Sequence, residues 1–190
     1  MSGTFTIDTE EQSKPIDTPY RPDVFKLVYG PLPSFSVLPD FDFDKFGDQA
    51  NSFASTLVET CKKNNGLSLS ANQCGFTHRV FVMGADDEYV AFFNPKIVSM
   101  SEDTIKLPEN SLTIPLIELK LTRPVSIDVE YQDFHGETHV RGFGGLSARL
   151  FQQQIDNLNG IMFIEHAKPL TLQMAKKRQT KLFKRMGVKI

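Results

Sequence analysis

The chain has 190 residues, of which 40% are hydrophobic and 23% charged, and its formal net charge is -2. This is ordinary globular composition, and the length suits one domain with tails that buries its core without disulfides or metals. The charge balance excludes a globally basic, nucleic-acid-binding or membrane-surface protein as the default interpretation.

The cysteine count and the hydropathy pattern indicate where the chain is made. Only Cys61 and Cys74 occur, so we expect no disulfide framework and a reducing compartment. The first residues lack the basic-then-apolar pattern of a secretory signal, and no apolar run approaches the roughly 20 residues of a spanning helix. We therefore expect a soluble protein that is cytoplasmic when made.

The first 24 residues differ from the rest of the chain. They are polar, and Pro15, Pro19 and Pro22 interrupt any regular structure. Such a segment buries too little apolar surface to fold alone. Two interpretations stay open: a disordered terminus, or an extended arm that becomes ordered against a partner. The expected organisation is an arm at 1–24, a main domain at 25–166 and a basic C-terminal helix or tail at 167–190.

Apolar spacing predicts three helices, at residues 43–63, 146–158 and 170–186. Alternation and β-branched or aromatic residues predict strands at 78–83, 88–93, 114–121, 125–131 and 137–143. A turn at residues 133–136 would join the last two strands as a hairpin, and Asn94-Pro95 is a turn signal after the second. This order of elements favours an α+β fold in one domain.

Basic residues accumulate at the C-terminal end, where no acidic residue follows Glu165. The basic residues are Lys168, Lys176, Lys177, Arg178, Lys181, Lys184, Arg185 and Lys189. Three interpretations remain: a solvated helix face that caps the fold, contact with an acidic protein, or contact with nucleic acid or the ribosome. Phosphate contacts would make the last of these strongly salt-dependent.

Three separated segments carry a recognisable pattern. Residues 66–73 read Gly-Leu-Ser-Leu-Ser-Ala-Asn-Gln, residues 109–113 read Glu-Asn-Ser-Leu-Thr, and residues 152–158 read Gln-Gln-Gln-Ile-Asp-Asn-Leu. In order and spacing they resemble the motifs Gly-x-Gly-Leu-Ala-Ala-x-Gln, Glu-Gly-Cys-Leu-Ser and Gln-His-Glu-x-Asp-His-Leu of the peptide deformylase family. The resemblance covers roughly residues 25–164. It implies mixed or antiparallel sheets around a central helix, followed by a C-terminal helix.

The family resemblance also implies a metal centre. In the family, the Cys of the second motif and both His of the third bind one divalent metal, and the Glu is the general base. The matching positions here are Ser111, Gln153 and Asn157 for the ligands and Gln154 for the base. A hydroxyl and neutral amides do not replace thiolate and imidazole, and an amide is no base at neutral pH. We therefore expect no metal, no other cofactor, no catalytic residue and no deformylation.

A substrate groove is the second implication of the resemblance. The side chain of Gln73 and the backbone N–H of Leu112 match the groups that polarise the formyl carbonyl in the family. A vestigial groove would be lined by Gly66, Gln73, Glu109 and Leu112. It could hold a peptide N-terminus by strand addition. Ser68 and Asn110, where the family has Gly, add bulk to it.

No second catalytic constellation emerges from the remaining residues. His135 and His139 flank the expected hairpin turn, which predicts exposed side chains, and Cys61 lies on the apolar face of the first helix. There is no phosphate-cradling glycine loop, nucleophile elbow or zinc-pair spacing.

Three functions follow as hypotheses. The first is an inactive deformylase relative in a larger assembly, such as the tail or baseplate region of a phage virion, with protein partners bound through the arm and the basic helix. The second is a non-catalytic binder of formylated or extended peptide N-termini. The third is an active peptide deformylase.

Overall fold

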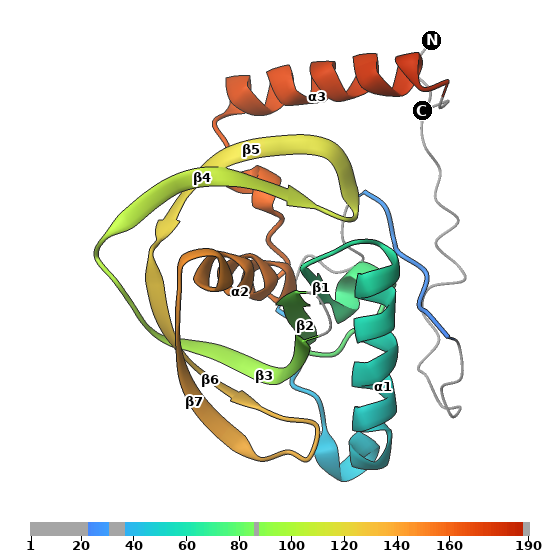
Figure 1. Ribbon diagram of the computed structural model, residues 1–190, viewed down its shortest axis with the longest axis vertical. Helices are drawn as coiled ribbons and strands as arrows, with labels where there is room; N and C mark the ends of the chain where they lie inside the picture. The colour runs from blue at the N-terminus through green and yellow to red at the C-terminus, as the bar shows by residue number, and fades with distance from the viewer. Residues whose placement is uncertain (1–22, 31–36, 86–87, 188–190) are drawn as a thin grey trace.

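The computed structural model describes residues 23–30, 37–85 and 88–187 (Figure 1). The helices are α1 (Phe43–Lys63), α2 (Gly145–Leu158) and α3 (Pro169–Arg185), with short 3-10 turns η2 (Ala71–Cys74) and η3 (Phe163–His166). The strands are β1 (Ser68–Ser70), β2 (Val80–Ala85), β3 (Glu88–Met100), β4 (Thr104–Ser111), β5 (Ile114–Pro124), β6 (Ser126–Gln132) and β7 (Thr138–Gly144). The arm expected at 1–24 lies almost entirely outside the described residues.

The strands form two separate sheets. Five pair in the order β1-β2-β3-β6-β7, and β4 pairs only with β5. Every described pairing is antiparallel. Figure 1 shows α2 in the middle of the molecule, with the β4–β5 hairpin on one side and β3, β6 and β7 on the other. The α+β prediction with a central helix and a C-terminal helix is therefore confirmed.

Helix α1 forms where its sequence predicts it, at residues 43–63. The Asp42 side chain accepts a hydrogen bond from the Lys45 backbone N–H, which satisfies one free donor of the first turn. Phe53, Leu57 and Cys61 recur on one face and are buried against β1 and β2. This packing places residue 66, just after the helix, beside the candidate site.

Aromatic packing seats α2 on the large sheet. Phe151 is fully buried, and its ring lies 4.9 Å from that of Phe81 and 5.3 Å from that of Phe92. Ala148, Ile155 and Leu158 bury in the same cluster. Because this face holds the helix on the sheet, its other faces are directed at β1, η2 and the β4–β5 hairpin.

One strand prediction is wrong, and one strand was not predicted. The Asn94-Pro95 signal does not end the second strand, since β3 continues to Met100. Asn94 has a φ of 48°, its side chain bonds both backbone groups of Phe41, and a register shift follows Phe93. This irregularity bends the strand without ending it. Strand β4 was missed because its residues are mostly exposed and polar. The hairpin of β6 and β7 around residues 133–136 is confirmed.

No helix in the described ranges combines the length and apolar character needed to cross a bilayer. None of the residues of helix α3 is buried.

Replacing Phe151 with alanine should lower the free energy of unfolding by about 3–5 kcal/mol, because it removes a fully buried ring and leaves a cavity beneath α2. Urea unfolding followed by circular dichroism measures the change. Val140→Ala is the matched control, because that side chain is 71% exposed. Equal losses in the two variants would show that α2 is not seated by this cluster.

Candidate functional site

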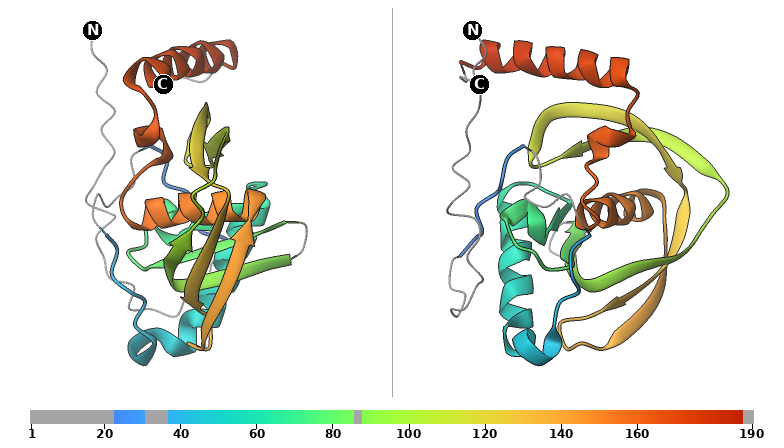
Figure 2. Two further views of the ribbon diagram at one scale, coloured as in Figure 1. Left: turned by 90° about the vertical axis from the view of Figure 1, so that its left-hand side faces the viewer. Right: turned by 180° about the vertical axis from the view of Figure 1, so that it is seen from behind.

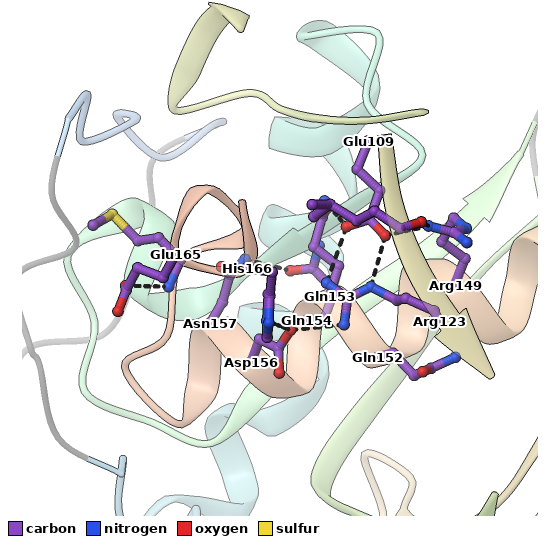
Figure 3. Close-up of polar contacts among 12 residues, drawn as sticks. Glu109, Arg123, Arg149, Gln152, Gln153, Gln154, Asp156, Asn157, Glu165 and His166 are labelled. Carbon is purple, nitrogen blue, oxygen red and sulfur yellow. Dashed lines mark hydrogen bonds and ion pairs between the residues drawn. The ribbon is translucent and has the colours of Figure 1, made fainter. Parts of the chain in front are cut away.

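The carboxylate of Glu109 is the most buried charge in the centre of the molecule. It accepts hydrogen bonds from Arg123 Nε at 2.6 Å and Arg123 Nη2 at 3.0 Å, and a further bond from Arg149 Nη1 (Figure 3). Arg149 also donates to the carbonyls of Ile105 and Leu121. This network ties β4, β5 and α2 together at one point.

Arg123 is shared between two carboxylates. Its Nη1 donates to Asp156 Oδ2 at 2.7 Å, and the same oxygen is 2.8 Å from His166 Nε2. Burial lowers the pKa of Arg123, but its hydrogen bonds and charge interactions with Glu109 and Asp156 outweigh this, and the net pKa is raised. The guanidinium therefore stays charged, and it is paired with Glu109 and Asp156.

Three of the four positions matched to the family's metal chemistry lie on α2, and all three are buried. Gln153 donates from Nε2 to Glu109 Oε2 at 3.2 Å and to the carbonyl of Asn110 at 3.1 Å. Gln154 donates to Ser68 Oγ at 2.8 Å, and its own Oε1 accepts from Asn157 Nδ2 at 3.3 Å. Gln153 thus faces the hairpin, whereas the other two face β1.

Gln73 links β1 to the hairpin. Its Oε1 accepts from the backbone N–H and the hydroxyl of Ser70, at 3.0 and 3.1 Å. Its Nε2 donates to Ser111 Oγ and Thr113 Oγ1, both at 3.1 Å. Gln73 is 2% exposed, so its amide is fixed in one orientation by four partners. Asn157 Nδ2 reaches the same cluster through Ser70 Oγ at 3.4 Å.

The structure brings the four positions into one polar region, but it does not join them all directly. Gln154 and Asn157 bond each other, whereas Ser111 reaches them only through Gln73 and Ser70. Hydrogen bonding among the four positions is therefore only partial. Among the described side chains, Asn72 Oδ1 is the only buried polar atom without a hydrogen-bond partner.

This donor set does not fit the divalent metal that the family resemblance implies. Ser111 offers a neutral hydroxyl, and the amide nitrogens of Gln153, Gln154 and Asn157 act as hydrogen-bond donors. An amide offers a metal only its neutral oxygen, and none of the four positions supplies a thiolate or an imidazole. The oxygen of Gln154 is already used by Asn157. These four side chains therefore support no metal-assisted catalytic step.

The groove residues lie at the β1 edge of the five-stranded sheet, next to this network, and Ser68 in this edge is 8% exposed. Gly84 N–H donates to the Leu67 carbonyl, and Ser70 N–H points away from β2 to Gln73. Because hydrogen-bonded pairs alternate along antiparallel strands, the N–H and C=O of Ser68 also point away from β2. Within the described residues they meet no hydrogen-bond partner, and neither does the N–H of Leu112.

Leu112 forms the wall opposite β1. A Cβ added at Gly66 would lie 2.6 Å from Leu112 Cδ1 and 3.1 Å from Cys61 Sγ, so the close contact requires glycine. The Gly66 carbonyl accepts from Tyr89 Oη at 2.7 Å and Cys61 Sγ at 3.1 Å. Gly66 and Leu112 therefore lie together, and Gln73 lies between β1 and the hairpin.

Sequence reasoning missed the partners of Glu109. These partners are Arg123 and Arg149, and the signal for them is that an acidic residue in a motif that becomes buried requires cationic partners. The hydroxyls of Ser68, Ser70 and Thr113 were also missed, because single serines and threonines carry no periodic signal.

The cysteines and the remaining histidines do not add a catalytic group. Burial raises the pKa of Cys61 to about 12, and burial together with the nearby Cys61 raises that of Cys74 to about 12. Both thiols are therefore protonated and unreactive at neutral pH. His135 is exposed, as expected. His139 is partly exposed and lies 2.8 Å from Asp133, beside Glu137 at the β6–β7 turn.

Comparisons with known proteins agree on one family. The family model described as polypeptide deformylase matches residues 38–173. The peptide deformylase of Synechocystis sp. is 32% identical over 141 residues, covering 71% of this chain and 75% of that protein. That of Rhizobium meliloti is 35% identical over 141 residues, covering 72% and 81%. The crystal structure of the Thermotoga maritima enzyme is 28% identical, with a TM-score of 0.72 over 77% of this chain and 99% of that one.

These findings correct the functional prediction made from the sequence. Relatives that match about 70% of the chain carry the name of an enzyme. The prediction of a non-enzyme that acts as a structural component or is incorporated in a virion is therefore wrong, and the inference of a lost metal site conflicts with the name of these relatives. That prediction used the side-chain chemistry of four positions to decide the activity of the whole chain.

Glu109→Gln should lower the free energy of unfolding by about 3–5 kcal/mol, because it leaves two buried guanidiniums without their shared carboxylate. Chemical denaturation measures this change. Glu118→Gln on the exposed face of β5 is the control and should change stability by less than about 0.5 kcal/mol. A small effect at both positions would mean that the pairing is energetically neutral.

The triple variant Ser111→Cys, Gln153→His, Asn157→His should bind Zn²⁺ with an apparent free energy on the order of 10 kcal/mol, because it supplies a thiolate and two imidazoles. Titration against a chelator of known affinity measures the gain over the unsubstituted chain. The double variant without the cysteine should fall between them. Equal affinity in the triple variant and the unsubstituted chain would contradict the fit argument.

Proposed function

Because the chain belongs to the peptide deformylase family, we propose that it acts on the formylated N-terminal segment of peptides, which it binds along the free edge of β1. The observation that carries this proposal is the set of backbone groups at Ser68 and Leu112 that have no partner among the described residues, next to the fixed amide of Gln73.

The edge of β1 suits an extended peptide. A peptide that pairs with the N–H and C=O of Ser68 would add a strand to the five-stranded sheet, and main-chain hydrogen bonds would supply affinity without selecting side chains. Leu67 is 41% exposed and lies next to this edge, where it offers apolar contact to a bound side chain. The opposite wall is Leu112.

A formyl carbonyl would find two donors at the end of this edge. The N–H of Leu112 is one, and Gln73 Nε2 is the other, because it can exchange its bond to Ser111 or Thr113 for a bond to the carbonyl oxygen. Two donors that bind one oxygen would also stabilise negative charge that develops on it. Recognition of the formyl group would therefore depend on Gln73.

Hydrolytic removal of the formyl group is the second candidate, favoured by the name that the relatives carry. This reaction would cleave the amide C–N bond with water and release formate. The family's metal is not a fit for Ser111, Gln153 and Asn157, and Glu109 is held by two guanidiniums. Binding and hydrolysis therefore need separate measurements.

We also propose a cytoplasmic location. Cys61 and Cys74 are both free, which suits a reducing compartment.

Gln73→Glu should weaken binding of formyl-Met-Ala-Ser by about tenfold or more, because a carboxylate repels the formyl oxygen and donates no hydrogen bond to it. The substitution keeps the acceptor for Ser70 but buries a carboxylate, so thermal unfolding must first show that the variant stays folded. Isothermal titration calorimetry with formylated and unformylated Met-Ala-Ser measures the effect.

Glu118→Gln is the control, and its affinity should equal that of the unsubstituted chain. If formylated and unformylated peptides bind equally, or if Gln73→Glu binds as before, the proposed recognition is incorrect. Formate release from the same samples then decides whether the bound peptide is also hydrolysed.

A further inference from the structure

We propose that residues 5–11 of this chain bind in the groove between α3 and β5, so that the acidic N-terminal segment is the cis partner of the basic C-terminal helix. This surface lies away from β1, and it does not depend on the function proposed for that edge.

The groove is a cavity of about 1070 Å³ lined by the β4–β5 hairpin and α3. Figures 1 and 2 show α3 lying across this hairpin at one end of the molecule. Leu172 and Ala175 pack against the small cluster formed by β5 and Phe163. The helix is therefore anchored along one face, while the groove remains open beside it.

Apolar side chains are left exposed inside this groove. Met174 is 64% exposed and Leu116 is 42% exposed, and both line the cavity. Leu116 also has a φ of 63°, a backbone conformation that L-residues with bulky side chains rarely adopt. Strain of this kind persists where the surrounding structure holds it, and it is concentrated at binding sites. An occupant with apolar side chains would cover both residues.

The charges of the groove specify an acidic occupant. Lys106, Lys120, Lys168 and Arg178 line it, and Glu118 is the only acidic residue among its lining residues. No acidic residue occurs on α3. Residues 5–11 combine the two required features, because Phe5 and Ile7 are followed by Asp8, Glu10 and Glu11.

The chain is long enough to place this segment there. Gly30 N–H donates to the Thr113 carbonyl at 2.9 Å, and Gln179 Nε2 of α3 donates to the Pro115 carbonyl at 2.6 Å. Gly30 thus bonds to the residue just before β5, and the middle of α3 bonds to the second residue of β5. Residues 11 to 30 can span about 60 Å when extended, whereas α3 is only about 26 Å long. Any position in the groove is within reach of the same molecule.

A single tryptophan tests the proposal, because the natural chain contains none. In the full chain carrying Phe5→Trp, emission should shift to shorter wavelength and acrylamide quenching should fall severalfold, relative to a peptide of residues 1–22 with the same substitution. Raising the salt concentration should reverse part of the shift, because it screens the exposed charges. The shift should not depend on protein concentration.

Charge reversal provides the matched comparison. Lys120→Glu with Arg178→Glu, both exposed and lining the groove, should return the emission and quenching to those of the free peptide. Lys177→Glu with Lys184→Glu makes the same charge change on α3 outside the groove lining and should keep most of the protection. Circular dichroism confirms that both variants keep their helix content.

Three results would overturn the proposal. In the first, the tryptophan of the full chain is as exposed as in the peptide. In the second, both double variants have the same effect, which means general charge attraction without a specific site. In the third, protection appears only as the protein concentration rises, which means that the segment binds a second copy of the chain.

Discussion

The structure depends on one buried carboxylate and its two guanidinium partners. Glu109 comes from β4, Arg123 from β5 and Arg149 from α2, and their side chains meet where almost no water reaches. A charge in such a place is tolerated only when it is paired and fully hydrogen-bonded. The pairing therefore determines how the hairpin sits on the central helix. It also determines where Ser111 and Leu112 lie, since both follow Glu109 after Asn110 along the chain.

The amide groups of α2 complete this arrangement. Gln153 extends the Glu109 network, while Gln154 and Asn157 bond the serines of β1, so a helix with many buried polar side chains leaves few of them unpaired. A network of this kind is rigid because each group restrains its neighbours. It holds the edge of β1, the amide of Gln73 and the N–H of Leu112 in fixed relation, whether or not the chain performs chemistry there.

Family membership and local donor chemistry answer different questions about this protein. The relatives show the family to which the chain belongs, because they share its fold and most of its length. The side chains at residues 111, 153, 154 and 157 determine what can be coordinated at those positions. The incorrect prediction of a particle component came from using the donor chemistry of these four positions to decide what the whole chain does. The edge of β1 that we propose to bind peptide offers mainly backbone groups, and Gln154 and Asn157 hold it through Ser68 and Ser70.

The sequence by itself determined the α+β class, both ends of α1, the β6–β7 hairpin and the family, because these follow from local periodicity, turn residues and motif order. Tertiary structure alone decided the course of β3 through Asn94, the existence of β4 and the partners of Glu109. These features depend on contacts between residues far apart in the chain, and an exposed polar strand or a buried ion pair has no periodic signature. The groove beneath α3 belongs to the same group, since it exists only where β5 and the C-terminal helix meet.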